Sequence, residues 1–278
     1  MRPATDTGTL RAGLAAVLAE ARERTWRLVD PLTDEDLRRQ HDALMSPVLW
    51  DLGHIGQFES LWLVRNTQGP VTFAEMPGLY DPFEHPRAAR GGLPLPGKAE
   101  MRAMLDGLRA EALTTLEGLD LEGDDPLLQD GYVVRMVAQH EYQHGETILQ
   151  TLQLKTGAPY AAPRGWSVPD PSHIPEAGAM VRFPGGEVQL GTDDRTAAYD
   201  NERPAHRVAL SPFWIDVTPV RNAEFLAFME AGGYTTRAWW SDEGWRWLQS
   251  AGVRAPTHWL REGGEWRTRS MDRVTAPD

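Results

Sequence analysis

The chain has 278 residues, enough for about two domains, and 41% of them are hydrophobic, which suffices for ordinary protein cores. It carries 40 acidic and 28 basic side chains, giving a formal net charge of −12, and such a surface repels phosphate backbones, so we expect no nucleic-acid partner. Cysteine is absent, which excludes disulfides, thiolate ligands and a cysteine nucleophile among these residues, so any metal must be held by His, Asp or Glu.

The first 26 residues do not resemble a secretion signal, because their apolar side chains have helical spacing and are interrupted by Arg and Glu. No window of the sequence approaches the ~20 apolar residues that a membrane-spanning helix needs. We therefore expect a soluble, cytoplasmic protein with no membrane partner, and we expect it to be a monomer.

Four helices are predicted in the first 155 residues. The first has apolar residues at 3- and 4-residue steps over positions 10–21. The second starts at Ser46-Pro47, a capping residue followed by proline at the first helical position. The third begins near Lys98, and the fourth covers about 127–154. Four helices with long connections predict a four-helix bundle, to which we assign residues 8–157.

A change in composition marks the rest of the chain. Five prolines within residues 158–177 prevent a continuous helix, and we assign this segment as a linker. Residues 178–278 contain Gly-Gly pairs, short β-type runs at 187–190, 206–210 and 213–217, and one short helical pattern at 221–230. This pattern predicts a loop-rich α+β domain, so the fold class is a helical domain followed by an α+β domain.

Two histidines in the stretch MVAQHEYQHGETILQ point to a metal site. His140 and His144 are four residues apart on a predicted helix, which places them on one face, about 40° apart around the axis. Val133 and Val137 continue that face, so both imidazoles should turn toward the bundle interior, where unpartnered polar groups are costly. A shared metal would satisfy both rings, although a histidine pair at this spacing is more often a surface pair or a hydrogen-bonded pair.

His54 is the third candidate ligand, because it shares a predicted inward face with Phe58 and Leu61; the alternative is an ordinary core histidine. Glu146 lies about 200° from His144 on the helical wheel and should face away from the site. Gln143 could reach the edge of the site or be a surface amide. Three imidazoles suit Zn²⁺ or Fe²⁺, and their spacing does not choose between the two metals.

The same residues carry a resemblance to a known family. PVLWDLGHIGQFE and QHEYQHGETILQTLQL resemble the DinB-like bundle of the ergothioneine-biosynthesis sulfoxide synthases, also called hercynine oxygenases. The resemblance implies that His54, His140 and His144 bind iron, while Glu146 completes the motif without bonding the metal. It also implies that Gln143 lies near the trimethylammonium substrate.

The segment YDPFEHPRAARGGLPLP is similar to the family's connection between its second and third helices. In the family, arginines of this connection contact the carboxylates of the thiol substrate. The resemblance therefore implies that Arg87 and Arg90 are substrate-binding residues.

The second domain resembles the formylglycine-generating-enzyme-like, C-type-lectin-like fold of the same family, through FPGGEVQLGTD, DNERPAHRVALSPFWIDVTPVRNAEFLAFM and AWWSDEGWRW. In the family this domain continues well beyond the equivalent of Asp278, and its catalytic tyrosine lies in that continuation. We therefore expect a truncated second domain, no assignable catalytic residue in this chain, and poor sulfoxide synthesis by the chain alone.

The resemblance implies a non-haem Fe(II), O₂-dependent oxidoreductase that joins cysteine or γ-glutamylcysteine to the imidazole C2 of hercynine and gives a sulfoxide. Three alternatives stay open. A selenoneine synthase would use the same site with selenium in the donor. A zinc-dependent thiol transferase would use the same bundle. A non-catalytic fragment would only bind a partner through its second domain.

Overall fold

The computed structural model of the chain describes residues 6–67, 78–161, 175–176, 178–196 and 198–277. The chain divides into two compact units. Unit 1 comprises Met1–Pro163 with Gly191–His206, and unit 2 comprises Arg164–Leu190 with Arg207–Asp278. Most of the proposed linker at 158–177 falls outside the described residues, so the domain boundaries remain predictions.

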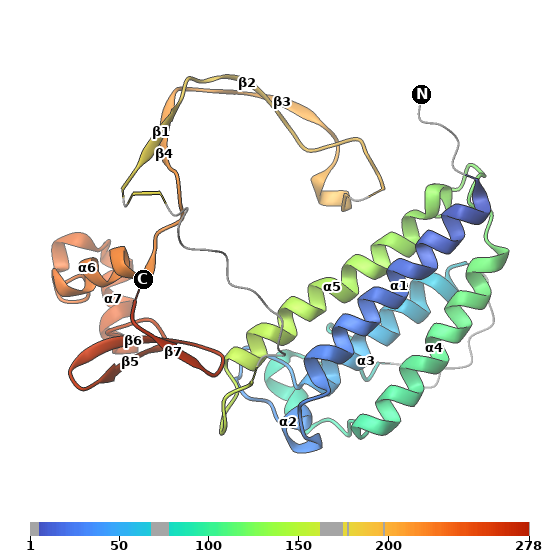
Figure 1. The fold of residues 1–278 in the computed structure, drawn as a ribbon, viewed down its shortest axis with the longest axis horizontal. Helices are drawn as coiled ribbons and strands as arrows, with labels where there is room; N and C mark the ends of the chain where they lie inside the picture. Colours follow the sequence, from blue (N-terminus) through green and yellow to red (C-terminus); the bar gives the residue numbers. More distant parts are fainter. Residues whose placement is uncertain (1–5, 68–77, 162–174, 177, 197, 278) are drawn as a thin grey trace. The chain divides into compact units, whose positions relative to one another are not determined.

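Unit 1 is built on four long helices, which run side by side in Figure 1. α1 packs against α5, and α3 packs against both α4 and α5, which confirms the predicted bundle. None of the helices in the described part of the chain is long and apolar enough to cross a membrane. The elements are α1 (Thr7–Val29), α2 (Asp34–Arg38), α3 (Val48–Glu59), a π-helical turn (Ser60–Arg65), a 3₁₀ turn (Arg87–Gly92), α4 (Lys98–Gly118), a 3₁₀ turn (Gln129–Gly131) and α5 (Tyr132–Gln153).

Two helix starts differ from the sequence prediction. α3 begins at Val48 rather than at Pro47, and the hydroxyl of Ser46 accepts a 2.7 Å hydrogen bond from Arg90 Nη1 instead of capping the helix. α5 begins at Tyr132 rather than near 127, because Asp130 and Gly131 have φ angles of +56° and +72°, which no α-helix contains. A glycine is needed at 131, since a Cβ there would lie 2.3 Å from Leu14 Cδ1.

The apolar core of the bundle comes from the predicted stripes of its helices. Its members lie in α1, α4, α5, the π-helical turn and the segment just after α4, and all are at most 6% exposed. They include Leu14, Leu18, Leu63, Val64, Ala112, Leu116, Val133, Val134, Val137 and Ala138. Burial of each of the larger side chains contributes roughly 1.5–3 kcal/mol to stability.

A ring of alternating charges is buried between the same helices. Arg22 of α1 donates 2.7 Å hydrogen bonds to Glu59 of α3 and to Glu141 of α5. Arg109 of α4 donates to Glu59 through Nε at 2.5 Å and to Glu141 through Nη2 at 3.1 Å. Burial opposes the charge on Arg22, but Glu141 and Glu59 outweigh it and raise the Arg22 pKa. Each of the four long helices thus supplies one member of a closed, electrically balanced ring.

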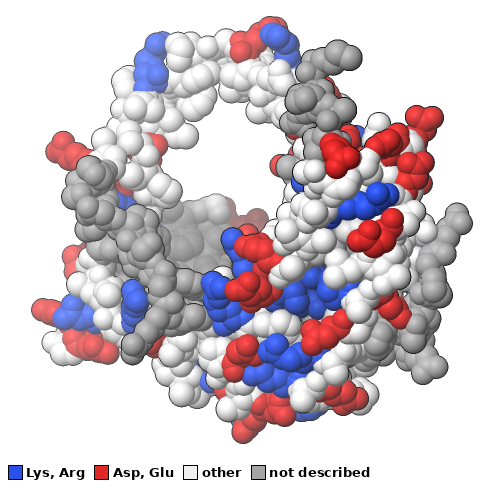
Figure 2. Space-filling view, turned by 45° about the vertical axis from the view of Figure 1, so that its right-hand side comes forward, with Lys and Arg blue, Asp and Glu red and all other residues white. Residues whose placement is uncertain are grey.

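The surface of the chain carries charges of a different kind. Figure 2 shows Asp and Glu side chains beside Lys and Arg side chains on the visible face. The pairs Arg24–Glu20 and Arg27–Glu23 of α1 are solvent-exposed and four residues apart. Such pairs contribute at most about 1 kcal/mol, because water screens them.

Unit 2 consists of small sheets and two short helices. β1 (Met180–Phe183) pairs with β4 (Phe213–Asp216), β2 (Gly186–Leu190) pairs with β3 (His206–Leu210), and β5 (Trp259–Glu262), β6 (Glu265–Ser270) and β7 (Arg273–Thr275) form a meander. The helices are α6 (Asn222–Glu230) and α7 (Asp242–Ala251). The three predicted β-type runs and the predicted helix at 221–230 are confirmed as β2, β3, β4 and α6.

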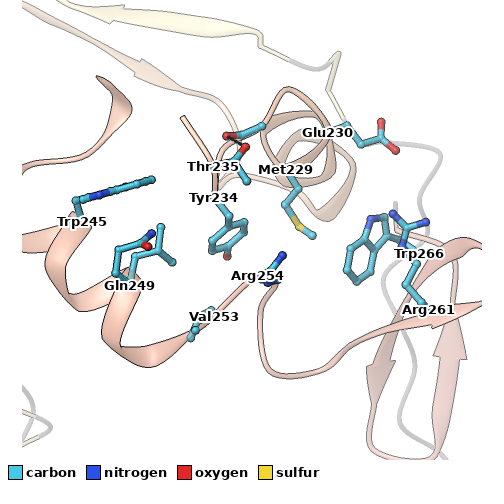
Figure 3. A pocket seen from close by; sticks show the side chains of 13 residues that line it. Met229, Glu230, Tyr234, Thr235, Trp245, Gln249, Val253, Arg254, Arg261 and Trp266 are labelled. Atoms are coloured by element: carbon cyan, nitrogen blue, oxygen red, sulfur yellow. Dashed lines mark hydrogen bonds between the residues drawn. The ribbon is translucent and has the colours of Figure 1, made fainter. Parts of the chain in front are cut away.

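A cavity of about 690 Å³ lies between α6, α7 and the β5–β6 hairpin of unit 2. Figure 3 shows Met229, Tyr234 and Arg254 between Trp245 on one side and Trp266 on the other. The lining includes aromatic, aliphatic and charged side chains, and none of the predicted site residues belongs to it.

We expect Arg22→Met to lower the free energy of unfolding by about 3–5 kcal/mol, because removing one cation leaves Glu59 and Glu141 short of a partner in a buried place. The measurement is urea unfolding followed by circular dichroism. Arg24→Met is the matched control, since it removes an exposed pair of α1 and should change stability by less than about 1 kcal/mol. Equal losses of unfolding free energy in the two variants would show that the buried ring stabilises the fold no more than an exposed ion pair does.

Candidate metal centre

The three predicted histidines meet inside the bundle. His54 lies on α3, while His140 and His144 lie one turn apart on α5, which packs against α3. Their candidate ligand nitrogens lie within 4.8 Å of one another. Two nitrogens each about 2.1 Å from one ion can be no more than about 4.2 Å apart, so small ring movements would let all three bind a single metal.

His54 is held in one orientation by its surroundings. A carbonyl oxygen can only accept, so His54 Nδ1–H donates the 2.8 Å hydrogen bond to the backbone oxygen of Tyr80. Nε2 is then the atom with a free lone pair. The indole of Trp50, one turn earlier on α3, stacks on the imidazole with centroids 5.1 Å apart and planes 12° from parallel.

Gly53 permits this arrangement, because a Cβ at position 53 would lie 2.1 Å from Cε1 of Tyr80. The Tyr80 ring therefore rests directly on the backbone of α3, and its side chain is only 1% exposed. A larger residue at position 53 would displace the same residue whose carbonyl orients His54.

His140 and His144 face the same space from α5. The ring of Phe58 stacks on His140 with centroids 3.7 Å apart and planes 9° from parallel. The Nδ1 atoms of both histidines are buried without a hydrogen-bond partner, which is costly in a protein interior. Nδ1 of His144 lies 3.3 Å from Oδ1 of Asp51, but the two groups are not aligned for a hydrogen bond. Such unsatisfied nitrogens fit a site whose rings reorient when a metal binds.

The electrostatics of the cluster favour neutral rings. Burial lowers the pKa of His140 to about 2, and the neighbouring His144 and His54 lower it too. Burial and His144 also lower the pKa of His54, against the opposing hydrogen bond to Tyr80. A neutral imidazole keeps a lone pair for a metal, so these two rings are ready to bind without first losing a proton.

Comparison with known proteins bears on this arrangement. Residues 18–148 match the DinB superfamily, and residues 167–277 match the sulfatase-modifying factor enzyme 1-like domain. The hercynine oxygenase of Mycolicibacterium smegmatis is 44% identical over 270 residues, which cover 95% of this chain and 61% of the relative. The chain is homologous to the hercynine oxygenases. The predicted family resemblance and the order of the two kinds of domain are thereby confirmed.

Two further hercynine oxygenases give the same result. That of Mycolicibacterium thermoresistibile is 44% identical and that of Mycobacterium tuberculosis is 45% identical, each over 92% of this chain. The matched region covers 57% and 59% of these two relatives. The chain thus spans about three fifths of the length of the hercynine oxygenases that it matches.

The remaining predicted site residues of this hercynine oxygenase homologue occupy different environments. Gln143 and Glu146 are exposed on α5. Arg87 is exposed, and its Nη1 donates a 2.9 Å hydrogen bond to the carbonyl of Leu44. Arg90 is only 5% exposed.

The Arg90 guanidinium has several contacts of its own. It lies 3.5 Å from the centre of the Trp50 ring and donates to Ser46 Oγ and to the carbonyl of His85. Arg90, Trp50 and His54 therefore form one continuous stack that ends at the histidine cluster.

Sequence reasoning missed Trp50, Asp51 and Tyr80 as neighbours of the cluster. Trp50 and Asp51 precede His54 by four and three residues, so helical spacing could have placed them beside it. Tyr80 carries no such signal, because it contributes through a backbone carbonyl in a turn.

We expect the metal-free chain to lose stability as the pH falls below about 6.5. The unfolded chain protonates His54 and His140 near that pH, whereas their folded pKa values are lowered, so the unfolded state binds more protons. The loss should reach at most about 1.4 kcal/mol per pH unit for each such histidine. Urea unfolding between about pH 7 and pH 5 measures it.

His140→Phe should make this pH dependence shallower, because it removes one of the buried bases. His206→Phe, at an exposed position of β3, is the control and should leave it unchanged. An identical dependence in wild type and His140→Phe would mean that His140 is not buried in its neutral form.

Proposed function

We propose that the chain is the metal-binding part of a non-haem Fe(II), O₂-dependent sulfoxide synthase that joins cysteine or γ-glutamylcysteine to hercynine. The observation that carries the proposal is the meeting of His54, His140 and His144 in a homologue of the hercynine oxygenases. These three residues are the proposed iron ligands. Bound iron would supply the O₂ chemistry, because three protein ligands leave coordination positions open to substrates.

The residues around the cluster have separate tasks in this proposal. Tyr80 and Trp50 hold the imidazole of His54, and Phe58 holds that of His140. The three histidines are only half-buried, which leaves one side of the site for substrates. Because His54 and His140 are kept neutral, their rings add no positive charge of their own to that of the proposed iron.

Arg87, Arg90 and Gln143 are the proposed substrate-binding residues. Arg87 is exposed, and Nη1 donates to the Leu44 carbonyl, so the rest of its guanidinium could donate to a carboxylate. Arg90 is buried, and its Nε and Nη1 donate to the His85 carbonyl and to Ser46 Oγ, so a substrate carboxylate would have to reach the Nη2 side of its guanidinium. Gln143 is exposed beside His144, where its amide could contact hercynine.

We expect the purified chain to bind about one Fe(II) under anaerobic conditions, and each of His54→Ala, His140→Ala and His144→Ala to weaken binding by more than about 100-fold. Loss of a residue that only orients a ligand lowers metal affinity by about 10–100-fold, and loss of the ligand itself should lower it more. Anaerobic titration with elemental analysis measures this.

Two controls accompany that titration. His206→Ala removes an exposed histidine, and Glu146→Gln removes an exposed carboxylate of α5; both should bind iron like wild type. Full metal content in the three cluster variants would refute the ligand assignment. Retention of zinc in preference to iron would instead favour the zinc-dependent thiol transferase.

We expect Arg87→Ala to weaken binding of γ-glutamylcysteine to the metal-loaded chain by roughly 10- to 100-fold, the value of a hydrogen bond to a charged group, while hercynine binding stays within about twofold. Isothermal titration of each substrate measures this. Arg27→Ala, an exposed arginine of α1 paired with Glu23, is the control. Equal effects on both substrates would exclude a specific contact with the thiol, and tighter binding of a selenium donor would favour selenoneine synthesis.

A further inference from the structure

Asp51 is a buried carboxylate beside the histidine cluster to which the proposed function assigns no role. It lies on α3, one turn before His54, and is 1% exposed. Its Oδ2 is buried without a hydrogen-bond partner, and Oδ1 lies 3.3 Å from Nδ1 of His144. Burying a carboxylate without a bonded cation is costly, so this position calls for a compensating interaction.

The neighbouring cation does not remove that cost. Arg90 is close enough for its charge to interact with that of Asp51. Its hydrogen bonds, however, go to Ser46 Oγ and to the carbonyl of His85, and its face rests on Trp50. Among the ion pairs of the described residues, the one contact that Asp51 makes is with His144.

We propose that Asp51 is a positioning residue that, after a small rotation of the His144 ring, accepts its Nδ1–H over the present 3.3 Å separation and so directs Nε2 of that ring to the metal. The inference rests on the proposed metal site. A neutral imidazole has one N–H and one lone pair, so fixing the proton on Nδ1 fixes the lone pair on Nε2. Tyr80 already does this for His54 through its carbonyl. Asp51 does the same for His144 with a carboxylate, which also makes the ring a stronger donor to a cation.

Two other roles for Asp51 make different predictions. A direct ligand would have to share the ligand cluster, but among the described residues the group of atoms within 4.8 Å of one another contains only the three histidines. A purely structural residue would stabilise the metal-free fold. A positioning residue predicts the opposite, because it places a poorly compensated charge in the bundle until a cation binds.

The experiment compares Asp51→Asn with wild type by titration with Co(II), read from its visible absorption spectrum, and by urea unfolding of the metal-free protein. We expect the Asn variant to bind Co(II) about 10- to 100-fold more weakly and its metal-free form to be as stable as wild type or more stable. Asp106→Asn, an exposed aspartate of α4, is the matched control and should change neither value.

A double-mutant cycle with His144→Ala tests whether Asp51 acts through that histidine. In the His144→Ala background, the titration is continued to Co(II) concentrations that saturate the protein. Asp51→Asn should then cause no further loss of Co(II) affinity. A further loss of the full size would overturn the inference, as would wild-type affinity in Asp51→Asn. If that variant does not fold, Asp51→Glu keeps the charge but displaces it, and unchanged affinity in it would overturn the inference too. Failure of wild type to bind Co(II) or Fe(II) would instead refute the proposed metal site.

Discussion

The helices that carry the histidine cluster are held in register by a buried ring of charges. The ring is formed by Arg22, Glu59, Arg109 and Glu141. Each member contacts two others, and each comes from a different long helix, so sliding any helix by one turn would break two buried ion pairs. Apolar packing alone is non-directional and would tolerate such a slide more easily. Glu59 directly follows Phe58, and Glu141 directly follows His140, so the contacts that register α3 against α5 also bring these two rings into stacked contact.

The histidine cluster was predictable because it follows from helical periodicity. His140 and His144 share a face with Val133 and Val137, which are buried as that periodicity requires. The charged ring was not predictable in the same way. An arginine or glutamate on an amphipathic helix is usually solvent-exposed, and only the rotation of four helices relative to one another shows that these four point at a common centre. Their sequence separation gives no sign of that rotation.

Other differences from the sequence prediction are local. α3 and α5 both begin later than predicted, after Pro47 and after Asp130-Gly131. A capping pattern shows that a helix begins nearby, but it does not fix which residue takes the first helical dihedral angles. The contribution of Tyr80 is a backbone carbonyl, which any residue could supply. Position 80 is restricted by its tyrosine ring, which packs on Gly53. That contact joins segments 27 residues apart in the chain.

The bundle therefore holds two buried groups of charges that are balanced in different ways. In the ring, two guanidinium groups face two carboxylates, so the charges compensate one another before anything binds. Near the cluster, Asp51 faces imidazoles, of which His54 and His140 are kept neutral by burial, and the bonds of Arg90 are directed elsewhere. A divalent cation would complete the second group as the arginines complete the first. Because the group is already assembled in the folded chain, metal binding would stabilise the fold by RT ln(1 + [metal]/Kd). The metal would then take part in the same balance of buried charge that holds the four helices together.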